Sequence, residues 1–163
     1  MKQRIFNVLF LCSGNSARSI MAEALLNKYG AARFRAFSAG SQPAGKVNPL
    51  AWERLRMESI PHAQTHSKSW DEFVKPGAPE LDFVITLCDK AADETCPLWP
   101  GQPITAHWGV PDPVAVEGEG RRLAFAQAFA VLERRIQLFA SLRPESLERL
   151  ALEVQVRAIG EAS

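Results

Sequence analysis

Four short apolar segments along the chain have the length and composition of buried β-strands. They lie at residues 4–11 (RIFNVLFL), 33–40 (RFRAFSAG), 81–87 (LDFVITL) and 103–108 (PITAHW). The first segment contains β-branched and aromatic residues and ends at Cys-Ser-Gly, which favours a strand over a helix. It is too short to span a bilayer and has no small-residue cleavage site, so we expect neither a membrane anchor nor a signal peptide.

Between and after these segments, apolar residues recur at the spacing of helices. We expect one helix from about Ser16 to Tyr29, ended by Gly30. A second is predicted over 48–58, because Asn48-Pro49 pairs a capping residue with a proline at the first helical position. Two more are predicted near the end of the chain. Their apolar faces comprise Phe125, Phe129, Leu132, Ile136 and Phe139 in the first and, after Pro144, Leu147, Leu150, Val154 and Ala158 in the second.

Strands that alternate with helices predict an α/β fold with a parallel sheet covered by helices on both faces. The chain has 163 residues, close to the commonest size of a domain, and contains no internal repeat, low-complexity segment or linker. We therefore expect a single domain over residues 1–163.

Charge and cysteine content exclude several classes of protein. A formal net charge of +1, with acids and bases spread along the chain, provides no basic stripe for nucleic acid. Three cysteines in a chain without a secretory signal argue against a structural disulfide framework. We expect a cytoplasmic protein with no nucleic-acid or membrane partner, in which the cysteines serve catalysis, redox chemistry or metal binding.

The stretch LFLCSGNSARSI, residues 9–20, joins the first strand to the first helix through a loop of small residues. In open α/β sheets ligands bind beyond the carboxyl ends of the strands, where Cys12 lies, and a helix N-terminus favours an anion. Gly14 and Asn15 tolerate left-handed backbone, so the loop can curl around a tetrahedral oxyanion, to which Arg18 would supply two parallel donors. The predicted oxyanion site comprises Cys12, Ser13, Gly14, Asn15, Ser16, Ala17 and Arg18.

The same surroundings are expected to activate Cys12. The helix N-terminus and Arg18 should lower the pKa of its thiol and leave a nucleophilic thiolate at neutral pH, with a hydrogen bond from Ser19 to the sulfur. The alternative is an inert buried Cys12 beside a surface arginine. A phosphate-binding Walker loop and a dinucleotide fingerprint are both excluded, because their glycine and lysine patterns are missing.

The strand, the Cys-x5-Arg-Ser loop and the helix resemble the signature of the low-molecular-weight protein tyrosine phosphatase family. The resemblance covers nearly the whole chain and includes FSAG at 37–40, VNP at 47–49 and HWGVPDP at 107–113. It implies four parallel strands in the order 2-1-3-4, with Cys12 as nucleophile, Arg18 on the oxyanion and Asp112 as general acid. Without the resemblance, Asp112 between two prolines would be interpreted as a turn-forming aspartate.

Within this family the chain is most similar to the thioredoxin-coupled arsenate reductases. That branch has a second cysteine after the third strand and a third before a proline, and Cys88 and Cys96-Pro97 occupy these positions. Phosphatases of the family usually carry a second loop cysteine before the arginine and aromatic residues after Asp-Pro. Here these positions hold Ala17 and Val114-Ala115. The alternatives for Cys88 and Cys96 are buried hydrophobes or, with less support, a zinc site.

The resemblance implies a thiol relay that reduces arsenate to arsenite. Cys12 attacks arsenic, Cys88 attacks Cys12, and Cys96 attacks Cys88 to give a disulfide that thioredoxin or a similar dithiol protein reduces. The helix between Cys88 and Cys96 must loosen, since residues eight apart on a helix rise about 12 Å and a disulfide needs Cα atoms within about 7 Å. No cofactor and no metal are required. Two other functions stay open: hydrolysis of phosphate monoesters through a Cys12 phosphoenzyme, and non-catalytic sensing of oxyanions or thiols.

The resemblance also predicts a group of residues that supports the loop. Some reductases of the family bind potassium behind the loop, and the matching positions here are Asn15, Glu23, Ser38 and Lys68. We expect the Lys68 ammonium to replace that cation, pairing with Glu23 and steadying Asn15. The alternative is an exposed lysine in a loop.

Overall fold

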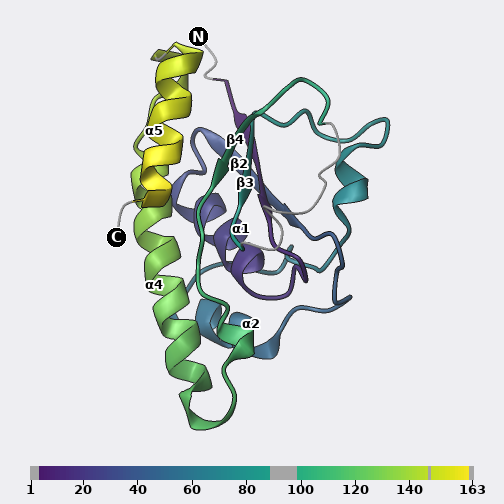
Figure 1. Cartoon of the computed structure of the whole chain (residues 1–163), viewed down its shortest axis with the longest axis vertical. Coiled ribbons are helices and arrows are strands. Elements are labelled where there is room, and N and C mark those ends of the chain that lie inside the picture. Colours follow the sequence, from purple (N-terminus) through teal and green to yellow (C-terminus); the bar gives the residue numbers. More distant parts are fainter. Residues whose placement is uncertain (1–3, 89–98, 147, 162–163) are drawn as a thin grey trace.

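The computed structural model describes residues 4–88, 99–146 and 148–161, which form a central sheet of four parallel strands (Figure 1). The strands are β1 (Phe6–Leu11), β2 (Phe34–Ala39), β3 (Phe83–Thr86) and β4 (Ile104–His107). Their order is β2-β1-β3-β4, which confirms the predicted topology. Each strand lies within its predicted segment. Leu11 pairs in register with Ala39 and Thr86, so the strands β2, β1 and β3 end at the same edge of the sheet.

The helices of the described chain are α1 (Arg18–Tyr29), α2 (Pro49–Met57), α4 (Arg121–Ala140) and α5 (Arg149–Glu161). Helix α1 contacts both β2 and α4, and α5 contacts β4. Figure 1 shows α4 and α5 stacked along one side of the molecule, with α1 between α4 and the sheet. Within the described ranges, no helix combines the length and the apolarity that crossing a membrane requires.

Two apolar clusters cover the two faces of the sheet. The larger joins Phe10 and Phe83 to the buried face of α4, on which all five predicted residues are buried. The smaller packs Leu9, Leu11 and Val84 against Phe73 of the short 3-10 helix η1 (Trp70–Phe73). Both faces are therefore buried. The helices predicted to cover them include α1 and α4 on one face, and among the described residues the short helix η1 and its neighbouring loops cover the other.

Local packing explains where two of the helices begin and end. The side chain of Asn48 accepts a hydrogen bond from the Leu50 amide at 2.9 Å, which confirms the predicted cap. Helix α1 ends at Gly30 as predicted, although Gly30 has a φ of −111° and is not left-handed. A Cβ at this position would lie 2.8 Å from Cδ1 of Leu26 and 3.1 Å from Cδ2 of Phe34. A side chain at residue 30 would therefore require the Leu26 and Phe34 side chains to shift, so this end of α1 is closely packed.

The predicted apolar face of α5 is wrong. Leu150 and Val154 are 72% and 61% exposed and Ala158 is exposed, whereas the buried residues are Leu152, Val156 and Ile159. Leu147 lies outside the described residues. The helix carries two apolar stripes, and contacts with Trp108 select the second.

Trp108 fixes the rotation of α5 in two ways. Its indole N–H donates to the Val156 carbonyl at 3.0 Å. A Cβ on Gly160 would lie 2.6 Å from both the His107 carbonyl oxygen and Cδ1 of Trp108, so only glycine permits this approach. These constraints come from β4, far away in the sequence, and helical periodicity alone does not contain them.

Candidate active site

The loop after β1 forms a cradle at the carboxyl edge of the sheet. Asn15 has a φ of 44°, so it adopts the predicted left-handed backbone, whereas Gly14 does not. The carbonyls of Ser13, Gly14 and Ser16 accept hydrogen bonds from the amides of Gln42, Ala44 and Asn48, at 2.9, 2.8 and 2.8 Å. These three bonds hold the backbone of the loop in its curled shape against the neighbouring segment.

The cradle opens into a cavity of about 340 Å³. Its lining unites residues from three separate parts of the sequence, all of them predicted site residues except Val114: Cys12, Ser13, Gly14, Ser16, Ala17, Arg18, Cys88, Asp112 and Val114. Asn15 is fully buried and lies outside this lining. Within the described ranges, no three His, Cys, Asp or Glu side chains converge as metal ligands. The lining suits an oxyanion.

The Arg18 guanidinium is held by the backbone of one loop and lies beside the Asp112 carboxylate. Nη1 donates to the Val110 carbonyl at 2.8 Å, and Nη2 lies 3.6 Å from Oδ2 of Asp112. Nε is buried and has no hydrogen-bond partner among the described residues. A buried donor without a partner is costly unless a ligand fills the place, so Nε is the donor that an oxyanion would satisfy.

Asp112 caps a turn and also lies beside Arg18. Its Oδ1 accepts from the Val114 amide at 3.0 Å and caps the short 3-10 helix η2 (Pro113–Ala115), which is the turn-forming role. Its Oδ2 faces Arg18 across the cavity, and the side chain is 42% exposed. A carboxyl group at the mouth of the cavity is placed to exchange protons with solvent and with a bound oxyanion.

Cys12 and Cys88 are in contact, and both are buried and free of disulfides. The contact follows from the fold, because Cys12 comes directly after β1 and Cys88 two residues after its parallel neighbour β3. The Ser13 amide donates to Cys88 Sγ at 3.4 Å, and the Ser13 hydroxyl lies 3.6 Å from the same sulfur. The third predicted cysteine, Cys96, and the helix predicted before it lie outside the described residues.

The electrostatics of Cys12 differ from the prediction. The hydrogen bond with Cys88 and the burial of the thiol raise the pKa of Cys12, and they outweigh Arg18 and the Gly14 amide, which lower it. The expected Cys12 thiolate at neutral pH is therefore not what this arrangement favours. Because the two thiols share a hydrogen bond, the first proton to leave belongs to the pair.

Ser19 also differs from the prediction. Among the described residues its hydroxyl oxygen accepts a hydrogen bond from Asn15 Nδ2 at 2.8 Å and makes no bond to Cys12. Ser19 is fully buried at the start of α1. Its contact steadies Asn15, so the side chain supports the loop from behind and does not touch the sulfur.

The four residues predicted to support the loop come together behind it. Lys68 Nζ lies 3.9 Å from Oε1 of Glu23, which also accepts a hydrogen bond from the Ser38 hydroxyl at 2.5 Å. The Lys68 side chain is only 9% exposed, which rules out the exposed-lysine alternative. Burial raises the pKa of Glu23 and lowers the pKa of Lys68. Asn15 is steadied by the backbone of Lys68 and not by its ammonium, since the Lys68 amide donates to Asn15 Oδ1 at 2.8 Å.

Gly40 is a contributor that sequence reasoning missed. A Cβ there would lie 2.6 Å from the Cys12 carbonyl oxygen and closer still to that of Ser13. Its amide and carbonyl also bond to Lys68 and Trp70, both at 3.0 Å. The signal was a glycine at the end of a strand, which often marks close backbone approach.

Comparison with known proteins places this site in a family. The profile described as "Low molecular weight phosphotyrosine protein phosphatase" matches residues 7–153. The chain belongs to this family. An arsenate reductase of Halalkalibacterium halodurans is 36% identical over 135 residues, which are 82% of this chain and 94% of that protein.

Solved structures of the family agree with the fold. An arsenate reductase from Archaeoglobus fulgidus superposes with a TM-score of 0.66 at 28% identity, over 83% of this chain and 99% of that one. An arsenate reductase in a phosphate-binding state gives a TM-score of 0.63 at 29% identity, over 81% of this chain and 97% of that one. The predicted phosphatase-like fold is therefore confirmed.

Proposed function

We propose that the protein is an arsenate reductase that converts arsenate to arsenite by a thiol relay through Cys12, Cys88 and Cys96. The contact between Cys12 and Cys88 at the oxyanion cavity carries this proposal. Hydrolysis of a phosphate ester requires one nucleophilic thiol, so the phosphatase reaction does not explain a second thiol in the site. The similarity to proteins named arsenate reductases, in sequence and in structure, supports the same function.

In the first step the cradle binds arsenate through loop amides and Arg18 Nε, the Cys12–Cys88 thiol pair releases one proton to solvent, and the resulting Cys12 thiolate attacks arsenic. An arsenic–oxygen bond breaks, Asp112 protonates the leaving oxygen, and water departs. A covalent Cys12–arsenic(V) adduct remains. Two observations support these roles of Arg18 and Asp112. Arg18 Nε has no hydrogen-bond partner among the described residues, and Arg18 Nη2 lies 3.6 Å from Asp112 Oδ2.

In the second step the Cys88 thiolate attacks Cys12 Sγ. The sulfur–sulfur bond forms as the sulfur–arsenic bond breaks, and its electron pair reduces arsenic(V) to arsenic(III), which leaves as arsenite. Both thiols are oxidised, so the two electrons balance. The Ser13 amide and hydroxyl beside Cys88 Sγ provide donors that stabilise a thiolate there.

In the third step Cys96 attacks Cys88, releases Cys12, and leaves a Cys88–Cys96 disulfide. Thioredoxin or a similar dithiol protein reduces this disulfide by exchange. Such a cycle needs a reducing compartment, so a cytoplasmic location belongs to the proposal.

A coupled assay tests the function directly. Arsenate, thioredoxin, thioredoxin reductase and NADPH are combined with the protein, and NADPH oxidation is followed with and without arsenate. We expect oxidation that depends on arsenate and on the protein. Its absence, with every reducing component shown to be active, would contradict the proposal.

A second candidate function is hydrolysis of phosphate monoesters, because Cys12, Arg18 and Asp112 line one cavity and would also serve that reaction. A parallel assay with an aryl phosphate separates the two. Efficient hydrolysis without arsenate reduction would favour the phosphatase. A protein that binds phosphate and turns over neither substrate would favour an oxyanion or thiol sensor.

A further inference from the structure

A second arginine, Arg135 of α4, is buried beside the segment that carries Asp112. Its residue exposure is 9%, and burial lowers the pKa of its guanidinium. Nη1 donates to the Gly109 carbonyl at 2.9 Å, and Nε is buried without a partner. No carboxylate among the described residues pairs with it. A buried cation held only by a carbonyl is costly for stability, which makes a purely structural role a poor explanation.

The carbonyls of two consecutive residues are each held by a buried arginine. Arg135 reaches Gly109 from α4, and Arg18 reaches Val110 from α1 at 2.8 Å. Two residues later comes Asp112, whose carboxylate faces Arg18. The position of this short segment therefore sets both the orientation of the Arg18 guanidinium and the place of the Asp112 carboxyl group.

The segment is anchored firmly just before this point. The Trp108 amide donates to the Thr86 carbonyl at 2.7 Å, and the Val110 amide donates to the Leu87 carbonyl at 2.9 Å. After Val110 the chain continues through Pro111, Asp112 and Pro113, and two of these lack an amide donor. Val110 is thus the last residue held before the chain reaches the carboxyl group, and Arg135 acts on its neighbour Gly109, one residue earlier.

We propose that Arg135 is a positioning residue for the reaction, acting through the Gly109–Val110 backbone on Asp112. This role rests on the proposed function. Arg135 does not line the oxyanion cavity, so its effect is on the placement of the acid and not on contact with substrate. A displacement of about 1 Å in a catalytic group can cost about 100-fold in rate, so a single carbonyl contact is sufficient for a large effect.

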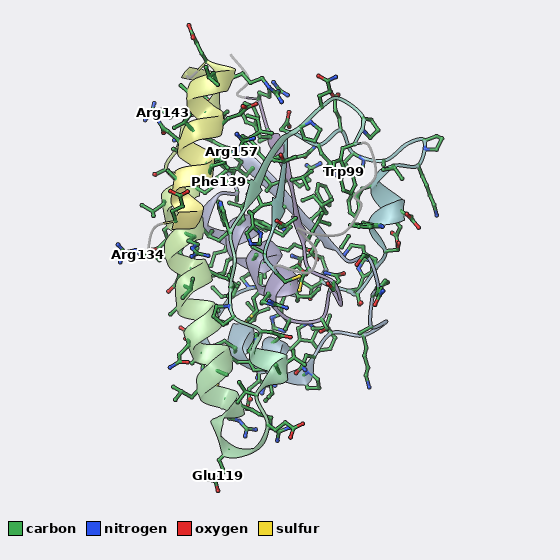
Figure 2. The ribbon with its side chains drawn as sticks, viewed as in Figure 1. Trp99, Glu119, Arg134, Phe139, Arg143 and Arg157 are labelled. Carbon is green, nitrogen blue, oxygen red and sulfur yellow. The ribbon has the colours of Figure 1, made fainter. Side chains whose placement is uncertain are left out.

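The test compares Arg135→Met with Arg134→Met. Methionine fills the buried space and removes the charge and the donor, so the fold should be retained. Arg134 is the adjacent residue on the same helix, is exposed, and points away from the molecule in Figure 2. Arg135→Lys is the rescue variant, because a lysine retains the charge and can donate to the Gly109 carbonyl but lacks the fixed planar geometry of the guanidinium.

We expect Arg135→Met to lower kcat for arsenate reduction about 10- to 100-fold, with KM changed less than about threefold. Arg134→Met should match the wild type, and Arg135→Lys should lie between. In an Asp112→Asn background, Arg135→Met should cost less than about twofold more, because the group that it positions is gone. Full additivity of the two substitutions would overturn the proposal.

Hydrogen exchange separates this proposal from the proposed function. Arg135→Met should accelerate exchange at the amides of Val110, Val114 and Ala115, the last two of which donate to Asp112. Arg134→Met should leave them unchanged. If the wild type does not reduce arsenate, the proposed function fails, and the exchange result still tests whether Arg135 holds the Gly109–Val110 backbone in place. Unchanged exchange in Arg135→Met would overturn the proposed positioning role of Arg135, whatever the activity of the variant.

Discussion

The thiols of Cys12 and Cys88 share a hydrogen bond at the carboxyl edge of the sheet, and the bond raises the pKa of Cys12. The two residues are 76 positions apart in the sequence and meet because β1 and β3 are parallel neighbours. The relationship serves a relay well, since the second nucleophile already stands beside the first. It also means that the two thiols cannot be activated independently.

Removal of Cys88 should therefore lower the pKa of Cys12. In Cys88→Ala the largest cause of the raised pKa is lost, while Arg18 and the Gly14 amide still favour the thiolate. A lower pKa means more thiolate at a given pH, so Cys12 should be alkylated faster at pH 6 to 7 than in the wild type. Peptide mapping after iodoacetamide across pH measures this. Sulfate or phosphate should slow alkylation in both proteins, and an unchanged or higher apparent pKa would refute the coupling.

Asp112→Asn should separate catalysis from anion binding. The amide retains an oxygen to cap η2 but cannot give up a proton, so kcat should fall about 100- to 10,000-fold. Loss of the negative charge 3.6 Å from Arg18 should leave anion affinity equal or stronger. Protection of Cys12 from alkylation by sulfate measures that affinity. A large loss of protection together with kcat would show that Asp112 acts on the fold of the loop and not as the acid.

Lys68→Met should destabilise the protein in a pH-dependent way. The substitution leaves the buried Glu23 carboxylate with Ser38 but without its cation, and we expect a loss of about 3 kcal/mol in the free energy of unfolding at pH 7. Glu23 already has a raised pKa, and loss of Lys68 raises it further, so protonation should relieve the cost as the pH falls toward 5. His66 and Glu72 also act on this pair and stay unchanged.

Thermal unfolding at pH 5 and pH 8 measures this effect, with Lys75→Met as the control because Lys75 is exposed. Destabilisation of Lys68→Met that is equal at both pH values would show that Glu23 does not need the Lys68 charge. The hypothesis that the Lys68 ammonium takes the place of a bound potassium ion predicts that replacing potassium by a bulky organic cation changes neither activity nor melting temperature of the wild type. A marked potassium requirement would refute that substitution.

Much of the fold was contained in local patterns. Each strand was marked by a short apolar run, and the buried face of α4 by residues such as Phe125 and Phe139, which lie on one side of any helix. The same rule failed for helix α5 because this helix carries two apolar stripes. The bond from Trp108 to Val156 and the close approach of Gly160 to His107 and Trp108 decide which stripe is buried. Apolar periodicity predicts the buried face of a helix only where the helix has a single apolar stripe.

In the candidate site, too, some features could be predicted from the local sequence and others depend on distant contacts. Cys12, Arg18 and the loop were recognisable from spacing, because the strand-loop-helix context dictates where they lie. The sign of the Cys12 pKa shift was not, because it depends on Cys88 from another strand. Arg135 was not recognisable either, since an arginine between apolar helical positions resembles any surface arginine until its carbonyl partner is known.

Cysteine-to-serine variants should fail at different steps of the relay. Cys12→Ser should abolish all turnover, because a serine hydroxyl in this cradle stays protonated and attacks arsenic poorly. Cys88→Ser should still allow attack on arsenate but release no arsenite. Cys96→Ser should release one arsenite per chain and then stall as a Cys12–Cys88 disulfide. Full steady-state activity in both Cys88→Ser and Cys96→Ser would exclude the relay.

The most direct test of the relay is a single turnover without reductant. The reduced wild-type protein is mixed with arsenate, and free thiols, arsenite and disulfide-linked peptides are measured in the same sample. We predict the loss of two thiols and the release of one arsenite per chain, with the disulfide between Cys88 and Cys96. Retention of all three thiols without arsenite, in a protein that hydrolyses aryl phosphates efficiently, would contradict the account and leave an ordinary phosphatase.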